Sequence, residues 1–185
     1  MRVNLLVGRF QPFTLGHMKC VEYAYEKTGL PTVIACISTS KRDAKHPFSD
    51  QLMKSVMNKL IDGKLVVDVI WIKTANIVEI GEMLTPKYEI ASWTCGTDRY
   101  NAYNRMATNY HDKAHLTDDF KLLEVVRGDE DISATKVRSA LRQDDEKEFK
   151  SMTPKSLHSM YKRLRDEILE IKESLSEYIS RLIYG

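Results

Sequence analysis

The chain has 185 residues, of which 43% are hydrophobic and 29% charged, so one domain with a proper core is expected rather than two. A net charge of +2 argues against a dedicated nucleic-acid binder, and no apolar run approaches the roughly 18 residues of a membrane helix. The start lacks the apolar segment of a signal peptide and the three cysteines show no paired spacing, so we expect a cytoplasmic protein with reduced thiols, no nucleic-acid partner and no membrane contact.

Strand-like and helix-like segments alternate along the chain, which predicts an α/β fold: a Rossmann-like, five-stranded parallel sheet with helices on both faces. The strands are expected at residues 2–7, 32–37, 65–72, 88–94 and 121–126. The helices between them are expected at residues 16–28, from Phe48 and Ser49 to Gly63, and at 77–84 and 99–109. Residues 110–119 are polar and are expected to form a loop.

The stretch Gly8-Arg9-Phe10-Gln11-Pro12-Phe13-Thr14-Leu15-Gly16-His17, here called motif one, follows the first strand and opens the first helix. Backbone N–H groups at a helix start are unpaired and attract anions. Gly16 carries no side chain that would hold a phosphate away from the backbone, and the imidazole of His17 would add a donor. Motif one therefore predicts a phosphate site, although an ordinary strand-to-helix connection also uses Gly and Pro.

A second stretch, motif two, is Asp131-Ile132-Ser133-Ala134-Thr135-Lys136-Val137-Arg138. Its Ser and Thr residues are placed to cap a helix, and Arg138 follows about one turn later, on the face that can turn toward an anion. In a parallel sheet both motifs and Gly96 would follow carboxyl ends of strands, where open α/β sheets bind ligands. Gly96 permits close backbone approach, and Asp98 can either cap the next helix or accept from a ribose hydroxyl.

Other polar groups allow two interpretations. The cations Lys41, Arg42 and Lys45 follow the second strand and suit phosphates, but a solvated loop is the simpler explanation for them. The acidic residues at 129–131 either help hold a magnesium ion or act as helix-dipole partners. We assign no protein ligands to a metal, and the histidines at 111 and 115 are interpreted as surface residues.

Motifs one and two resemble the signatures of the nucleotidyltransferase superfamily, and motif one is most similar to nicotinamide-nucleotide adenylyltransferases of the archaeal type. The resemblance implies transfer of an adenylyl group from ATP to nicotinamide mononucleotide, giving NAD and pyrophosphate, with Mg²⁺ bound mainly through the triphosphate. It implies that His17, Thr14 and Arg138 act on the triphosphate. It places further residues around the nucleotide: Gly8, Arg9, Phe10, Gly16, Gly96, Asp98, Ile132, Ser133 and Thr135. Candidates for contacting the second substrate are Lys41, Arg42, Lys45 and Asn76.

One position departs from the family. Counting from Asn76, the tryptophan that stacks on nicotinamide in the archaeal-type enzymes is replaced by Gly81, while Trp71 and Trp93 lie on expected strands and are interpreted as core residues. Two alternatives therefore remain: a cytidylyl- or adenylyltransferase acting on another small phosphate ester, and a nucleotide-binding oligomeric scaffold without catalytic activity.

From Pro154 onward the apolar residues follow a heptad spacing, which predicts one long C-terminal helix. At about 1.5 Å per residue it would be longer than a core of this size can cover. We therefore divide the chain into a nucleotidyltransferase domain at 1–152 and a helical extension at 153–185, and predict homo-oligomerisation through the extension. The alternative is a helix packed along its own domain.

Overall fold

The computed structural model describes residues 1–39, 42–126 and 132–171. The chain forms two compact units, each made of several segments. The sheet unit comprises Met1–Arg9, His17–Ser38 and Ile61–Asp131, and the helical unit comprises Phe10–Gly16, Thr39–Leu60 and Ile132–Gly185.

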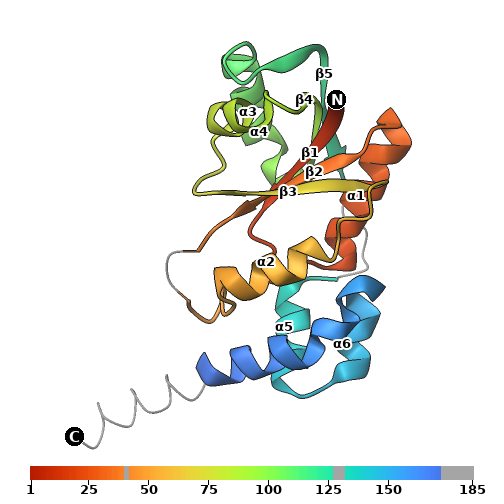
Figure 1. The fold of residues 1–185 in the computed structure, drawn as a ribbon, viewed down its shortest axis with the longest axis vertical. Coiled ribbons are helices and arrows are strands. Elements are labelled where there is room, and N and C mark those ends of the chain that lie inside the picture. The colour runs from red at the N-terminus through yellow and green to blue at the C-terminus, as the bar shows by residue number, and fades with distance from the viewer. Residues whose placement is uncertain (40–41, 127–131, 172–185) are drawn as a thin grey trace, which may run out of the picture. The chain divides into compact units, whose positions relative to one another are not determined.

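The sheet unit contains a five-stranded sheet, in which all neighbouring strands are parallel (Figure 1). The strands are β1 (Arg2–Gly8), β2 (Thr32–Ile37), β3 (Val66–Ile72), β4 (Glu89–Gly96) and β5 (Leu116–Val125), in the order β3-β2-β1-β4-β5. The chain thus moves outward from β1 to β3 and then returns to β4 on the other side of β1. This reversal is the topological switch of Rossmann-like folds, and it confirms the predicted fold class.

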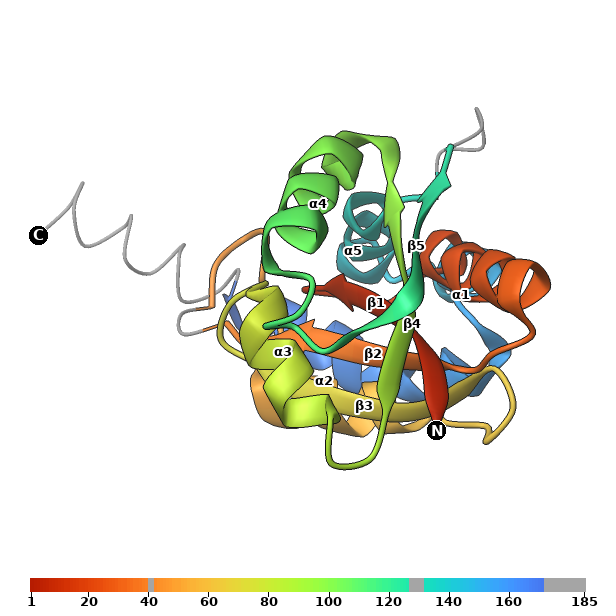
Figure 2. The same cartoon turned by 90° about the horizontal axis from the view of Figure 1, so that it is seen from above.

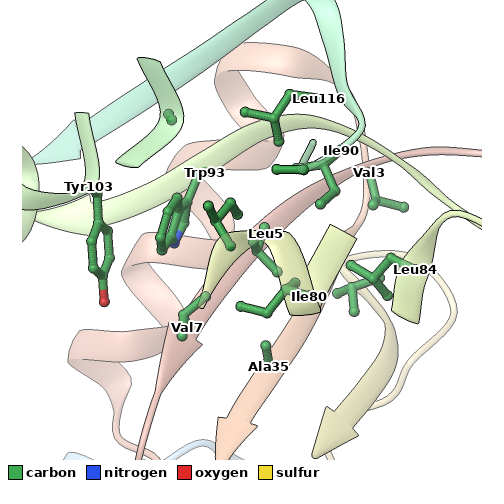
Figure 3. Close-up of a cluster of buried hydrophobic side chains, with 14 of the residues drawn as sticks. Val3, Leu5, Val7, Ala35, Ile80, Leu84, Ile90, Trp93, Tyr103 and Leu116 are labelled. Atoms are coloured by element: carbon green, nitrogen blue, oxygen red, sulfur yellow. The ribbon is translucent and has the colours of Figure 1, made fainter. Parts of the chain in front are cut away.

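Helices cover both faces of this sheet. Figure 2 shows α3 (Ile77–Leu84) and α4 (Thr97–Tyr110) on one face and α1 (Leu15–Thr28) on the other. The face under α3 and α4 holds a cluster of buried apolar side chains that includes Leu5, Ile80 and Trp93 (Figure 3). Trp93 is fully buried and stacks on Tyr103 with ring centroids 3.9 Å apart, as expected for a core residue. Trp71, on the edge strand β3, is only partly buried.

The helical unit is built from α2 (Asp50–Asn58), α5 (Ala134–Arg142), α6 (Glu146–Met152), the 3₁₀ helix η1 (Lys155–Met160) and a helix at residues 161–171. Its largest buried side chains include Phe13, Phe48 and Phe149. Ser49 caps α2 and Ser133 caps α5, each accepting from the backbone N–H three residues later. Both caps satisfy donors that the helix itself leaves unpaired.

Four expected boundaries are wrong. Helix α2 ends at Asn58 instead of continuing to Gly63. Strand β5 begins at Leu116 rather than 121, because an irregular ladder lets Ile90 pair with Leu116 and Ser92 with Lys121 despite the polar residues between. Strand β4 runs directly into α4, without the expected loop at residues 95–98. Residues 155–160 form a 3₁₀ turn instead of the first part of one long α-helix.

The first heptad positions, Leu157, Tyr161, Leu164 and Ile168, are buried in the structure of the single chain. The later ones, from residue 172 on, lie outside the described residues. The domain boundary at residue 153 and assembly through the extension therefore stay predictions. In the part of the chain that the structure describes, no helix is both long and apolar enough to cross a membrane.

Candidate functional site

The carboxyl edge of the sheet unit carries two of the predicted glycines. Leu6 of β1 pairs with Thr94 of β4, and each strand ends two residues later, at Gly8 and Gly96 respectively. The two glycines therefore stand at the ends of neighbouring strands, on either side of the point where the strand order reverses. This is the edge at which parallel α/β sheets bind ligands.

Of two polar candidate residues near this edge, Asn76 has a structural role and Asp98 does not cap a helix. Gly96, not Asp98, is the N-cap of α4, so the expected capping role of Asp98 is wrong; its carboxylate lies in the exposed first turn, 3.5 Å from Arg99 Nε. Asn76 caps α3, and its side-chain oxygen accepts from Val78 N at 3.0 Å. A ribose contact by Asp98 and a substrate contact by Asn76 stay predictions.

Gly81 explains the missing stacking tryptophan. It lies in the buried part of α3, and a Cβ built on it would stand 2.1 Å from the carbonyl oxygen of Ala114. Both residues belong to the sheet unit, and the atom that the Cβ would meet is a backbone atom, which cannot turn away as a side chain can. No side chain fits at this position without movement of the chain, so an aromatic ring cannot be presented to a ligand from here.

Gly81→Ala is expected to lower the free energy of unfolding by about 2 kcal/mol, because overpacking against backbone outweighs the gain in helix propensity of ~1 kcal/mol. Urea denaturation measures the change. The matched control is Glu82→Ala on the exposed side of the same helix, expected to stay within about 0.5 kcal/mol of the wild type. Equal stabilities for Gly81→Ala and the wild type would contradict the close packing.

In the helical unit, motif one meets motif two. Arg138 is 8% exposed, and its Nη1 donates to the carbonyl oxygen of Gln11 at 2.8 Å across 127 positions of sequence. Its Nη2 donates to Thr135 Oγ1 at 3.0 Å. Gly16 lies close by: a Cβ there would be 3.1 Å from the carbonyl oxygen of Ile132. The two stretches that the sequence analysis singled out are therefore joined in space.

The predicted site residues are divided between the units. The helical unit contains Phe10, Thr14, Gly16, Arg42, Lys45, Ile132, Ser133, Thr135 and Arg138. The sheet unit holds Gly8, Arg9, His17, Asn76, Gly96 and Asp98, and Lys41 lies outside the described residues. His17 follows Gly16 directly in the chain and is the third residue of α1, half-buried.

Backbone and burial define what motif one can present. Thr14 is 1% exposed, and Phe10 is buried with its ring 5.3 Å from that of Phe13. Phe10 also has a φ of +47°, a left-handed conformation that is strained for a bulky residue and is held here by its burial. The ring of Phe10 is thus part of the core, and a contact between Phe10 and phosphate would come from its backbone.

The charge of Arg138 is only partly compensated. Burial lowers the pKa of its guanidinium below the ordinary value, the nearby positive charge of Arg142 lowers it further, and Asp43 acts in the opposite direction. Within the described residues, two of the five N–H groups of this guanidinium are engaged. A buried cation next to a second cation favours the binding of an anion, as a phosphate group requires.

Sequence reasoning missed Gln11. Its side chain is 5% exposed and pairs with the backbone of Phe48, with Oε1 accepting from the N–H at 3.1 Å and Nε2 donating to the carbonyl at 3.4 Å. Because its own carbonyl accepts from Arg138, Gln11 connects motif two to the segment before α2. The signal in the sequence was a polar side chain inside an otherwise apolar turn.

Arg42 is engaged inside the helical unit. Its Nε donates to the carbonyl of Pro47 at 2.7 Å and its Nη2 to that of Glu167 at 2.9 Å, so a substrate would compete with these bonds. A shallow depression of about 370 Å³ lies on the same unit, lined by Leu52, Arg163, Asp166, Glu167 and Glu170. Three carboxylates against one guanidinium disfavour a polyphosphate there.

Among the described ranges, no three His, Cys, Asp or Glu side chains gather at one place. The acidic residues at 129–131 lie outside those ranges. Binding of Mg²⁺ through the oxygens of a triphosphate, which are hard ligands of the kind this ion prefers, stays a prediction.

Solved structures show the same fold at low sequence identity. The Plasmodium falciparum nicotinic acid mononucleotide adenylyltransferase, complexed with APC, has a TM-score of 0.57 at 12% identity, covering 91% of this chain and 98% of that one. A putative nicotinate-nucleotide adenylyltransferase from Vibrio parahaemolyticus has 0.56 at 14%, covering 89% and 94%. A bifunctional NMN adenylyltransferase/ADP ribose pyrophosphatase from Francisella tularensis has 0.63 at 15%, covering all of this chain but 57% of that one.

No curated protein matches the chain in a sequence comparison. The family model described as cytidylyltransferase-like matches residues 5–140, which includes motif one, the sheet from Leu5 onward and motif two through Arg138. This match confirms the resemblance to the nucleotidyltransferase superfamily, while the similarity to the archaeal type stays a prediction. The chain therefore belongs to the cytidylyltransferase-like family of nucleotidyltransferases.

Proposed function

We propose that the protein transfers the adenylyl group of ATP to nicotinamide mononucleotide, giving NAD and pyrophosphate by direct in-line displacement. The observation that carries this proposal is the buried guanidinium of Arg138, which joins motif two to motif one through the carbonyl of Gln11. Membership of a nucleotidyltransferase family supports the reaction type. Similar folds in nicotinate- and nicotinamide-nucleotide adenylyltransferases support the choice of substrates.

The proposed chemistry needs positioning rather than a strong base. The attacking oxygen belongs to the phosphate of the acceptor, which is already ionised, and it displaces pyrophosphate from the α-phosphorus. Thr14, His17 and Arg138 would bind the triphosphate and stabilise the charge that develops on the leaving group. The N–H groups at the start of α1, where Gly16 allows close approach, would add backbone donors. A Mg²⁺ ion bound to the triphosphate would neutralise part of its charge.

One observation favours an acceptor other than nicotinamide mononucleotide. The backbone of Ala114 leaves no room for a side chain at Gly81, so the aromatic stack expected for nicotinamide is absent from that position. Loss of a stacking partner costs ~1 kcal/mol or more. Transfer from ATP or CTP to a different small phosphate ester is therefore the alternative, and a scaffold without catalytic activity is the outcome if no pair reacts.

A matrix of triphosphates and acceptors tests these possibilities. Purified protein with Mg²⁺ is incubated with ATP or CTP and with nicotinamide mononucleotide, nicotinate mononucleotide or other phosphate esters, and pyrophosphate release is measured. We expect release to require both ATP and nicotinamide mononucleotide, with NAD identified as the product. Pyrophosphate release with a different pair would favour transfer to another phosphate ester. No release with any pair would favour a nucleotide-binding scaffold without catalytic activity.

A further inference from the structure

Residues 42–49 of the helical unit form a turn that carries one candidate substrate-binding group, Lys45, while the imidazole of His46 pairs with the carboxylate of Asp43 at 3.2 Å. The carboxylate of Asp43 accepts from the backbone N–H groups of Lys45 and His46, each at 2.7 Å. Asp43 and His46 also exchange backbone hydrogen bonds of 3.1 and 3.2 Å. These bonds shape the turn internally, but they do not attach it to the rest of the unit. We call this segment the 42–49 loop.

The helix at residues 161–171 holds the 42–49 loop through Glu167. The carboxylate of Glu167 is 15% exposed; its Oε1 accepts from Ser49 N at 2.7 Å and lies 3.3 Å from Arg42 Nη2. The same guanidinium donates to the carbonyls of Glu167 and Pro47. One acidic side chain thus holds both ends of the loop, which begins at Arg42 and ends at Ser49.

Two further contacts connect the loop to the motifs. Arg142, four residues after Arg138 on α5, donates to the carbonyl of Ala44 at 3.1 Å. Gln11 of motif one pairs with the backbone of Phe48, and its carbonyl accepts from Arg138. Hydrogen bonds, together with the covalent chain between them, therefore link Glu167 through Ser49, Phe48 and Gln11 to Arg138.

We propose that Glu167 is a positioning residue, which fixes the 42–49 loop so that Lys45 is held ready for an anionic ligand bound at Arg138. The proposal rests on the proposed function for the identity of that ligand, a nucleoside triphosphate. Glu167 itself touches no substrate. Its carboxylate pairs with Arg42, so Arg42 supports the loop. Lys45 is then the cation of the loop that would contact the ligand.

The direction of the effect separates positioning from plain electrostatics. Removal of a carboxylate from the surroundings of a phosphate site strengthens anion binding when charge alone matters. Positioning predicts the reverse, because a loop that is in its binding-competent form for a tenth of the time weakens binding about 10-fold. Glu167 and its neighbour Glu170 allow the comparison, because Glu170 lies 3.9 Å from Arg42, is 68% exposed and shares no bond with Ser49.

The experiment compares Glu167→Ala and Glu167→Gln with Glu170→Ala and Glu170→Gln. ATP affinity is measured by calorimetry and loop order by the rate of tryptic cleavage after Arg42 and Lys45, which needs no turnover. We expect Glu167→Ala to bind ATP about 10-fold more weakly and to be cleaved faster, with KM for ATP raised and kcat within about 2-fold. Glu167→Gln, which keeps an acceptor for Ser49 N, is expected to be intermediate, and both Glu170 variants should match the wild type.

The proposal would be overturned if the Glu167 variants were cleaved at the same rate and bound ATP with the same affinity as the Glu170 variants. Tighter binding of ATP by the Glu167 variants would also overturn it. Melting temperatures of all variants are recorded, and the glutamine variant decides if the alanine variant does not fold. A wild type that binds ATP but turns over no acceptor would count against the proposed function alone. Positioning of the ATP site by Glu167 would then still be decided by affinity and cleavage.

Discussion

Replacing Arg138 by alanine is expected to lower kcat/KM by on the order of 10³-fold, because one side chain serves two purposes. Its guanidinium is the proposed donor to the triphosphate, and it is also the hydrogen-bond partner of the Gln11 carbonyl inside the helical unit. Alanine removes the donor and leaves a buried carbonyl unpaired, so the turn of motif one loses its support as well. The measurement is steady-state pyrophosphate release with ATP and the best acceptor.

Two variants control for charge and folding. Arg138→Lys keeps the positive charge but cannot hold Gln11 and Thr135 with one planar group, so it is expected to recover less than a tenth of the lost activity. Arg163→Ala removes an exposed arginine of the same unit and should leave kcat/KM within about 2-fold. A folded Arg138→Ala protein with wild-type kinetics would remove Arg138 from the site.

His17→Ala is expected to lower turnover by at least ~100-fold, the effect of losing one donor that acts on the transition state. The imidazole stands in the first turn of α1, directly after Gly16, where helix geometry directs unpaired N–H groups toward an anion. Because the donor is proposed to act most strongly on the leaving pyrophosphate, kcat should fall more than KM rises. Single-turnover measurements with saturating ATP distinguish a slower chemical step from weaker binding of ATP.

The matched control for His17 is His115→Asn, which removes an exposed histidine from the turn before β5. His115 has a φ of +51°, a conformation that asparagine tolerates well, so this change should leave both stability and turnover near wild type. Equal turnover for His17→Ala and His115→Asn would exclude a catalytic role for His17. The same pair of variants, melted side by side, shows whether loss of the imidazole at position 17 disturbs α1.

The periodicity of the sequence was sufficient to predict the sheet and its helices. The buried strands are mainly apolar and end at Gly or polar residues, as β1 and β2 show, although β1 also buries Asn4. Several helices have a cap or a stop that is local in sequence. The helix at Ile77–Leu84 was predicted with its correct ends, because Asn76 and Pro86 mark them. Strand β5 was placed five residues late, because the pairing with β4 that starts it at Leu116 is not local.

The sequence by itself determined the family, the order of elements and the two motifs, because short-range patterns and residue types carry that information. Only the tertiary structure decided that Arg138 is bonded to Gln11, that Ala114 excludes a side chain at Gly81, and that Arg42 is held by Glu167. Each of these facts is a contact between residues 33 or more positions apart. Such contacts depend on how the chain packs, and no local pattern of residues specifies their partners.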